Sequence, residues 1–477
     1  MEKNLEELKL PYGQYTLKLK VTADGYEDSN FSNEVVYTSR PRVEKTSSIS
    51  IEVYGLIDGV TGVQVYIDDV LVKTVDYTAE GASVPFVIDL TDVNPDDDAT
   101  HDVRVVATGE GVPKNTSNTV AIYFGDAQIF SVSGEGASNP TLTRGDSAVG
   151  LGYTLNADGS ITSDFDNCRP WSDITEVTDD KGNVFMRVPK HYTRYTFDEN
   201  GYKKTEICVQ KPDDTWLLNP IFTNGNGVEL DYVDIGKYTA SGSSSLAKSV
   251  SGASPLVNIN INNMRNACKA NGTGYQQYDI WAHVMLQDLF KVEFATTNAQ
   301  SIMYGYANNN SAAIASGRTD GVLTASGSEI SNTDGKHAMK YRGVENWYGN
   351  VYQWMDGITV NSLKPYVCKD PTKYVSGSLP ADYSAVSYNG VTGGNSRVKK
   401  LGYDATNPFV QVPTDLGGSD TTYYCDYGYY SSSTYRVVYV GGGWGSTLNA
   451  GPWYFYAFND ATSAYSGIGG RLLRRPL

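Results

Sequence analysis

The chain has little cysteine, little histidine and no long apolar run. Its five cysteines, Cys168, Cys208, Cys268, Cys368 and Cys425, are odd in number and scattered, and no pair has CxxC spacing. This set predicts neither a disulfide framework nor a zinc site, and it favours folding in a reducing compartment. No apolar stretch approaches the roughly 18 to 20 residues of a membrane span, and the N-terminus lacks the apolar core of a secretory signal. We therefore expect no membrane insertion.

Motifs that carry chemistry are also scarce. The histidines, His101, His191, His283 and His337, stand alone, and the sequence has no HExxH, GxSxG, P-loop or dinucleotide-binding pattern. Gly441-Gly442-Gly443 precedes a tryptophan rather than a helix, which disfavours a phosphate cradle. We predict no cofactor, no metal and no catalytic residues. A glycan-cleaving enzyme stays open, because sequence does not show which carboxylates would flank a glycosidic bond.

Basic residues are outnumbered by acidic ones. With 38 Lys and Arg against 54 Asp and Glu, the formal net charge is −16, which argues against nucleic acid as a partner. The basic cluster at Arg471, Arg474 and Arg475 is expected to pack against the last strand. The acidic run Asp92, Asp96, Asp97 and Asp98 lacks regular ligand spacing, so a solvated loop is favoured over a calcium site.

An internal repeat organises the N-terminal part of this 477-residue chain, whose length predicts two to four domains. Residues 15–37 resemble residues 101–123, with Ser32-Asn33 matching Ser117-Asn118. Each copy has an alternating strand, a turn with a glycine (Gly25 or Gly111) and a second strand, as at the end of an immunoglobulin-like sandwich.

Four further segments with strand patterns lie between the two copies: residues 49–54, 62–67, 70–75 and 84–90. Residues 41–125 therefore predict one immunoglobulin-like domain, and residues 1–40 predict only the last strands of another. A lone two-stranded ribbon is barely stable. We expect either that the chain is the C-terminal part of a longer protein or that the ribbon docks on a neighbour.

Residues 126–477 predict one large, mostly β domain with minor α structure. Helical spacing of apolar residues predicts a helix over 279–295, and a weaker pattern predicts one over 257–270. The stretches 307–333 and 391–418 are Gly-rich, and we expect them to be irregular.

The region from about 423 to 471 has an unusual composition. Ten of the 36 tyrosines lie between Tyr423 and Tyr465, among Trp, Phe, Ser, Asn and Gly, with almost no Lys or Glu. Tyr and Trp supply contact area with few rotatable bonds, while Ser, Gly and Asn supply adaptable hydrogen bonds, so the mixture is typical of a recognition surface. An aromatic β core is the alternative, which the alternation over residues 454–458 supports.

Three segments carry a family resemblance. Residues 343–356 (GVENWYGNVYQWMD), 436–444 (RVVYVGGGW) and 469–473 (GGRLL) resemble the core motif and closing segments of the formylglycine-generating-enzyme type of C-type lectin fold. With the bracketed aromatic region, the set resembles the variable proteins of diversity-generating retroelements, among them phage tail receptor-binding proteins. The catalytic members use C-terminal cysteines to bind copper. Residues 436–477 contain no cysteine, so only the scaffold is implied.

The resemblance implies a tail receptor-binding protein of a virion, assembled in the host cytoplasm, that binds a host-cell surface receptor, protein or glycan. Other tail proteins are implied partners, and a homotrimer is implied as well. Implied scaffold residues are Asn350, Trp354, Gly441, Gly442, Trp444, Ala450, Gly451, Phe455, Gly469 and Arg471. Implied ligand-binding residues are Tyr427, Tyr429, Tyr430, Ser431, Gly443, Gly445, Ser446, Thr447, Asn449, Trp453, Tyr456, Phe458, Tyr465 and Gly467.

Three alternatives stay open. One is a bacterial surface adhesin of the same family, on the cell surface. Another is a tail-tip enzyme that acts on surface glycans. The third is a structural tail component whose aromatic tract is a trimer interface.

Overall fold

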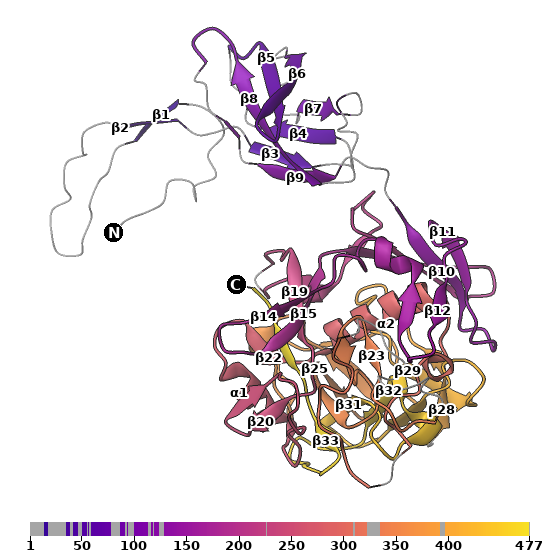
Figure 1. Ribbon diagram of the computed structural model, residues 1–477. Helices are drawn as coiled ribbons and strands as arrows, with labels where there is room; N and C mark the ends of the chain where they lie inside the picture. Colours follow the sequence, from indigo (N-terminus) through magenta and orange to yellow (C-terminus); the bar gives the residue numbers. More distant parts are fainter. Residues whose placement is uncertain are drawn as a thin grey trace, which may run out of the picture. The chain divides into compact units, whose positions relative to one another are not determined.

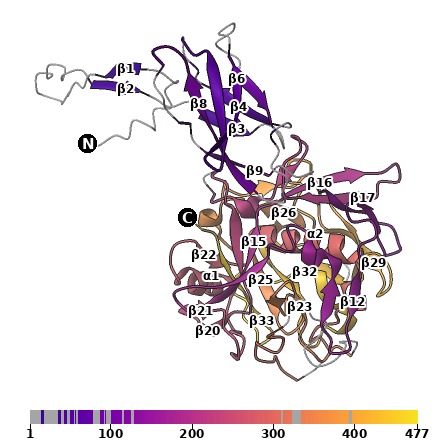
Figure 2. The same ribbon diagram turned by 45° about the horizontal axis from the view of Figure 1, so that its top comes forward.

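The computed structural model shows a mostly β protein with minor α structure, 39% strand and 11% helix (Figures 1 and 2), which confirms the predicted class. It describes residues 14–17, 35–38, 42–45, 50–54, 56, 59–77, 86–90, 93, 100–112, 116–117, 119–123, 128–225, 227–308, 311–321, 334–391 and 396–476. The chain divides into two compact units: Met1–Ala127 with Gln210–Asp214, and Gln128–Val209 with Thr215–Leu477.

The first unit contains a sandwich of two antiparallel sheets. One sheet has the order β3 (Arg42–Lys45), β4 (Ser50–Tyr54), β7 (Phe86–Asp89), and the other β6 (Val70–Asp76), β5 (Gly62–Ile67), β8 (Thr100–Thr108), β9 (Val120–Tyr123). Ile51 and Ile88 of the first sheet share one buried core with Val63, Val65 and Val103 of the second. The strands predicted between the repeat copies are confirmed where the structure describes them.

Both repeat copies contain a paired ribbon. Strand β1 (Gln14–Leu17) pairs antiparallel with β2 (Val35–Thr38), as β8 does with β9. Gly111 turns between β8 and β9 with a φ of 74°, a conformation that favours glycine. Gly25 and the four aspartates of the acidic run lie outside the described residues, as does any calcium site there.

Three large sheets build the second unit. The first two have five strands each: β11 (Thr143–Asp146), β10 (Phe130–Glu135), β17 (Lys203–Cys208), β16 (Tyr192–Phe197), β18 (Leu217–Leu218); and β14 (Thr175–Thr178), β15 (Val184–Pro189), β19 (Tyr232–Gly236), β34 (Leu472–Arg474), β22 (Tyr275–Gln277). The third, which we call the main sheet, has nine: β27 (Ser384–Ala385), β26 (Lys364–Val367), β25 (Tyr352–Asn361), β31 (Arg436–Gly441), β32 (Gly451–Ala457), β30 (Tyr427–Tyr430), β28 (Ser396–Leu401), β29 (Pro413–Gly418), with β33 (Ile468–Gly469) beside β25.

Three two-stranded ribbons complete the described strands of this unit: β12 (Tyr153–Leu155) with β13 (Ile161–Ser163), β20 (Ser241–Ser243) with β21 (Leu246–Lys248), and β23 (Lys340–Tyr341) with β24 (Val344–Glu345). Strands β28 and β29 lie within the stretch 391–418, so the expectation that this stretch is irregular is wrong. The described part of 307–333, residues 307–308 and 311–321, contains neither helix nor strand, as expected.

Two α-helices are described, and both predicted helices are confirmed. Helix α1 (Ile261–Lys269) begins after Asn260, whose side chain accepts a hydrogen bond from Asn263 N. Helix α2 (Ile280–Phe294) is capped in the same way by Asp279 and ends at Ala295 in the left-handed conformation. Every residue of α2 is buried. The helix therefore serves as the centre of the unit, in contact with β10, β17, β25 and β32 (Figures 1 and 2).

The main sheet separates two cores. Val438, Val440 and Phe455 belong to the core that contains α2, whereas Val437 and Tyr439 belong to the core that contains α1. This division follows from strand geometry, because successive side chains point to opposite faces of a sheet.

Arg471, next to the last strand, joins distant parts of this unit. Its guanidinium donates to Gln353 Oε1 and to the backbone oxygens of Gly236, Lys237, Glu345 and Asn346, at 2.7 to 3.1 Å. All five N–H donors of arginine are thereby used. The side chain is fully buried without a carboxylate partner, and burial lowers its pKa to about 10.

Replacing Arg471 by lysine should lower the free energy of unfolding of the second unit by about 2 to 6 kcal/mol, the cost of two buried oxygens left without a donor. Lysine has three donors, so at least two buried oxygens would lose their partner. All seven tryptophans lie between Trp171 and Trp453, so urea unfolding followed by tryptophan fluorescence reports on this unit alone.

Arg436→Lys is the matched control. Its guanidinium bonds only backbone oxygens at exposed positions, so we expect a change within about 0.5 kcal/mol. Equal midpoints for Arg471→Lys and Arg436→Lys would contradict the role assigned to Arg471.

Candidate ligand-binding surface

Seven aromatic side chains form one cluster on the main sheet. They come from four adjacent strands and the residue after β32, and we call them the tyrosine cluster: Tyr352, Tyr427, Tyr429, Tyr439, Tyr454, Tyr456 and Phe458. All lie on the face opposite to α2, because the side chains of every second residue share a face. Within 453–458, the even-numbered residues belong to the cluster and the odd-numbered ones face the α2 core.

Ring stacking holds the tyrosine cluster together. The Tyr456 ring lies between Tyr439 and Tyr429, with centroid distances of 4.8 and 5.0 Å and interplanar angles of 16° and 27°. Tyr454 stacks on Tyr427 at 5.9 Å, and Phe458 lies 5.4 Å from Tyr429. Contacts of this kind contribute about 0.5 to 1.5 kcal/mol per pair beyond the area they bury. The cluster is therefore a preorganised surface.

Solvent exposure varies across the tyrosine cluster. Tyr439 and Tyr454 are buried, Tyr427, Tyr429 and Tyr456 are half-buried, and Phe458 is 47% exposed. Burial raises the pKa of Tyr427, Tyr439, Tyr454 and Tyr456. These phenols are neutral at physiological pH, so the surface offers apolar rings and hydroxyl groups.

The loop from β31 to β32 borders the cluster. The hydroxyls of Ser446 and Tyr352 are hydrogen-bonded at 2.9 Å, and Gly443 N donates to Ser446 Oγ. Gly443 is buried against Tyr352, since a Cβ built on it would lie 3.1 Å from that ring. Gly467 approaches the Trp444 ring in the same way, at 3.3 Å.

The structure brings many of the predicted ligand-binding residues together. Tyr427, Tyr429, Tyr456 and Phe458 belong to the tyrosine cluster itself. Tyr465 is 55% exposed and lies near enough to Tyr439 and Tyr456 to affect their pKa values. Half-buried or exposed positions on the flanking loops are Ser431, Gly445, Thr447, Asn449 and Gly467.

Four predicted ligand-binding residues are buried instead. Trp453 and Tyr430 point to the opposite face of the main sheet, where Trp453 packs against Phe290 and Tyr430 against Phe455. Ser446 and Gly443 are buried against Tyr352. Trp453 and Tyr430 are buried because alternate residues of a strand point to opposite faces of the sheet. Ser446 and Gly443 are buried because the loop packs closely against Tyr352.

The predicted scaffold residues make specific contacts. The Asn350 side chain accepts from Ile314 N and donates to Ile314 O, which fixes the irregular segment after 307. Trp354 Nε1 donates to Ile259 O at 2.9 Å. A Cβ on Gly442 would lie 2.7 Å from Ala450, and one on Gly469 would lie 2.8 Å from a backbone oxygen.

Gly451 is packed equally tightly, because a Cβ there would lie 2.2 Å from the buried carboxylate of Asp426. Gly441 has a φ of 88°, which favours glycine. Ala450 and Phe455 are buried, and Trp444 is half-buried over Gly467.

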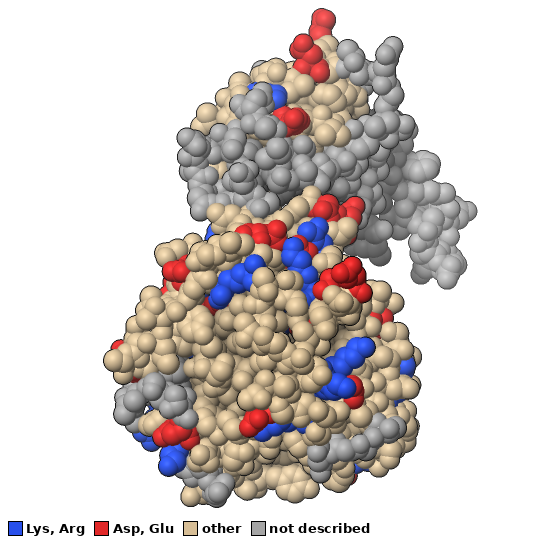
Figure 3. Space-filling model, turned by 90° about the vertical axis from the view of Figure 1, so that its right-hand side faces the viewer, with Lys and Arg blue, Asp and Glu red and all other residues tan. Residues whose placement is uncertain are grey.

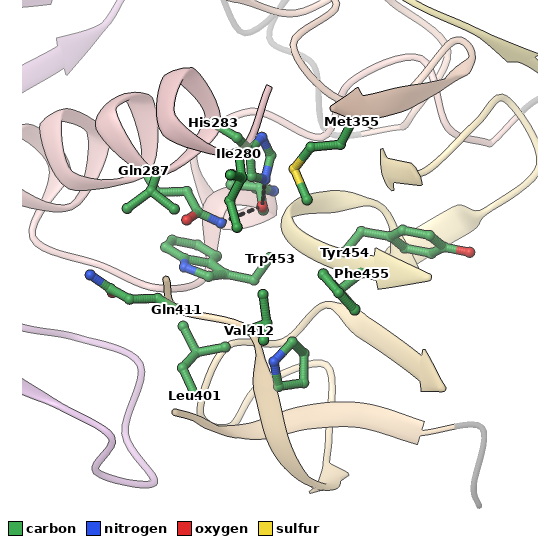
Figure 4. Close-up of a pocket in the computed structure, with 13 residues that line it drawn as sticks. Ile280, His283, Gln287, Met355, Leu401, Gln411, Val412, Trp453, Tyr454 and Phe455 are labelled. Atoms are coloured by element: carbon green, nitrogen blue, oxygen red, sulfur yellow. Dashed lines mark hydrogen bonds between the residues drawn. The ribbon is translucent and has the colours of Figure 1, made fainter. Parts of the chain in front are cut away.

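A small pocket lies on the other face of the main sheet. It is lined by α2, β32 and the segment before β29, and it has about 10 Å³ of space for the centre of a water-sized molecule (Figure 4). His283 Nε2 and Gln287 Nε2 both lie 2.7 Å from Pro452 O, as the dashed lines in Figure 4 mark. This space is about that of a single water, so the pocket is too small for a larger ligand.

Charged side chains are few and mixed on the face shown in Figure 3. Among the ion pairs of the second unit, Arg194 pairs with Glu206 and Lys204 pairs with Asp146. Among the described residues, no helix is long and apolar enough to cross a membrane, and no group of three His, Cys, Asp or Glu could hold a metal ion. Within the described residues, the five cysteines form no disulfide with one another.

Sequence reasoning missed three members of the tyrosine cluster: Tyr352, which is half-buried, and Tyr439 and Tyr454, which are buried. The sequence did contain the information, because Tyr454, Tyr456 and Phe458 are alternate residues of one strand and its extension, and alternate side chains share a face. The predicted ligand-binding residues were selected by composition, so they include side chains from both faces of the strand, such as Trp453.

No protein-family model matches this chain, and no curated protein matches it. Among solved structures, it is similar to the M1 variant of the Major Tropism Determinant, with 11% identity and a TM-score of 0.26 over 84% of this chain and 91% of that one. The U1 and P3c variants match over the same shares, with 11% and 10% identity and a TM-score of 0.24 each.

The stability of the second unit should fall as pH rises above about 10, the ordinary pKa of tyrosine. Because the folded-state pKa of Tyr439 and of Tyr454 is raised, the stability that the neutral phenols provide is complete below pH 10 and is lost above it. Tyr454→Phe removes one such group and should reduce the alkaline loss.

Urea midpoints measured from pH 8 to pH 11 check this, with Tyr435→Phe as control because that ring is 41% exposed. A pH profile of Tyr454→Phe identical to that of the unchanged chain would contradict the prediction.

Proposed function

We propose that this chain is a receptor-binding protein of a phage tail, located in the tail fibre or tail tip of the virion and assembled in the host cytoplasm. In this proposal the second unit binds a protein or glycan on the host-cell surface through the tyrosine cluster and its flanking loops. Other tail proteins hold the chain, and it functions as a homotrimer.

The observation that carries the proposal is the tyrosine cluster. Tyr and Trp are enriched among the residues that dominate binding energy in interfaces. Stacked rings lose little conformational entropy on binding, because they are already ordered. The exposed Phe458 and Tyr465 at the rim, together with the Ser, Thr and Asn positions of the loops, supply the adaptable contacts of a recognition surface.

We further propose that the exposed positions between 423 and 471 are diversified by a retroelement, while the scaffold stays constant. The contacts of Gly442, Gly451 and Arg471 support this, because a larger or different side chain there would collide with backbone or leave buried oxygens unpaired. The side chains of rim positions such as Thr447 and Phe458 are exposed.

We propose binding without catalysis. The phenols of Tyr427 and Tyr456 are neutral, since burial raises their pKa, and a neutral phenol serves as a hydrogen-bond donor rather than a nucleophile. A surface adhesin of a bacterium would use the same contacts. The DNA test below distinguishes a diversified binding protein from a constant structural component.

Phe458→Ala should weaken binding of the full chain to host cells by about 30-fold or more, the effect of losing about 2 kcal/mol at an interface hot spot. Phe197→Ala is the matched control, because that ring is 45% exposed against 47% for Phe458 and contacts Tyr403 away from the cluster. Cell-binding isotherms with both labelled variants measure the difference. Equal losses for the two variants would sink the proposal.

The DNA around the gene should contain a near-copy of the coding segment for residues 423–471 and a reverse transcriptase gene. The copy should differ only opposite adenines, at codons of exposed positions. Sequencing the locus in related isolates checks both features. If the copy is absent, or if the differences fall on codons of buried scaffold residues, the diversification proposal is wrong.

A further inference from the structure

A buried lysine, a glutamine amide and a carboxylate meet inside the second unit, apart from the tyrosine cluster. Lys203 Nζ donates to Gln411 Oε1 and lies 2.9 Å from Glu135 Oε1. Lys203 is 6% exposed, Gln411 5% and Glu135 3%. They come from β17, from the segment before β29 and from the end of β10, so the fold alone brings them together.

The surroundings exclude water and hold each group in place. Lys291 Nζ lies 2.8 Å from Glu135 Oε2 and 2.9 Å from Asp288. The Tyr195 hydroxyl donates to Asp288, and its ring, packed against Phe409, has its centroid 5.2 Å from Lys203 Nζ. Figure 4 shows the Gln411 amide directed away from the pocket that the rest of its side chain lines. The Gln411 amide nitrogen donates to Pro408 O at 3.4 Å, so the amide is held on both sides.

These three groups are the parts of an acyl transfer. A neutral amine attacks a carbonyl carbon, and a carboxylate carries the proton from the amine to the leaving group. Burial lowers the pKa of the Lys203 ammonium to about 8, which favours the neutral amine that the attack requires. Fixed contact between the reactants replaces the encounter that the same reaction requires in solution.

We propose that Lys203 and Gln411 form an intramolecular isopeptide bond. Lys203 Nζ attacks Gln411 Cδ and forms a C–N bond. Glu135 takes a proton from Nζ and transfers it to Gln411 Nε2 as the bond between Cδ and Nε2 breaks. One ammonia leaves, and no oxidant, reductant or other reactant is required.

The bond would join residues that lie 208 positions apart, β17 on one side and the main sheet on the other. A covalent link restricts the unfolded chain most strongly when it closes a long loop. It would keep the sheet that carries the tyrosine cluster attached to the rest of the unit under force or protease attack. This proposal does not depend on the proposed receptor binding.

The intact mass of the purified full chain tests the proposal directly. We expect a mass lower than that of the sequence by one ammonia, and a protease digest that contains a branched peptide with Lys203 joined to Gln411. A measured mass equal to that calculated from the sequence overturns the proposal, and this measurement needs no variant.

A mass deficit of one ammonia has a second possible source, because ring closure at an Asn-Gly pair such as Asn389-Gly390 also releases ammonia. Variants are therefore needed to assign the deficit to Lys203. Lys203→Met should have the full mass of its sequence, whereas Lys204→Met, on the same strand but paired with Asp146 and Glu206, should keep the deficit. Near-ultraviolet circular dichroism verifies that both fold. A mass deficit that persists in Lys203→Met overturns the proposal. If that variant does not fold, the presence or absence of the branched peptide in a digest of the unchanged chain decides whether the bond exists.

Glu135→Gln tests the proton transfer. It should leave most of the chain at full mass after purification, while Lys203 and Gln411 are both present. Complete bond formation in a folded Glu135→Gln chain would overturn the role of Glu135 in the step.

Discussion

The second unit depends on one buried guanidinium. Arg471 has no acidic partner, and its five hydrogen bonds end on backbone oxygens of β19 and β24 and on Gln353 of β25. Gln353 in turn donates to the backbone of Asn346 and Trp347. The residue that follows the aromatic region is thus tied to the strand on which the main sheet is built. The exposed side chains of the aromatic region can therefore change while the backbone held by Arg471 stays in place.

Buried ionic contacts order the loop-rich parts of this unit. Arg342 pairs with Glu293 of α2 and with Asp166, Arg265 pairs with Asp356, and Arg475 pairs with Asp279. Replacing such pairs with apolar residues is often neutral for stability, so their net contribution is small. They do fix which segments lie together, since either charge alone in the core would be costly. Lys203 and Glu135 belong to this class of contact, with the difference that an amide lies beside the amine.

Much of the fold could be predicted from sequence. The helix over 279–295 follows from spacing and the Asp279 cap, and the first unit's strands follow from alternation. The roles of Trp354, Gly442 and Arg471 were expected from motif resemblance, and the structure supplies the contacts. The strands β28 and β29 were missed because their pairing, with register shifts, joins segments that carry no alternating pattern.

The sequence by itself determined that residues 423–471 are rich in aromatic rings and that the residues of 453–458 alternate between two faces. It did not determine which face of the strand meets solvent, because odd-numbered and even-numbered positions both carry large aromatic rings. The tertiary structure decided this by placing α2 against Trp453 and Phe455, and by inserting β30 parallel to β32 so that Tyr427 and Tyr429 stack on Tyr454 and Tyr456. The physical reason is that burial depends on which element packs on which face, and α2, the helix that covers one face of β32, lies more than a hundred residues away in the chain.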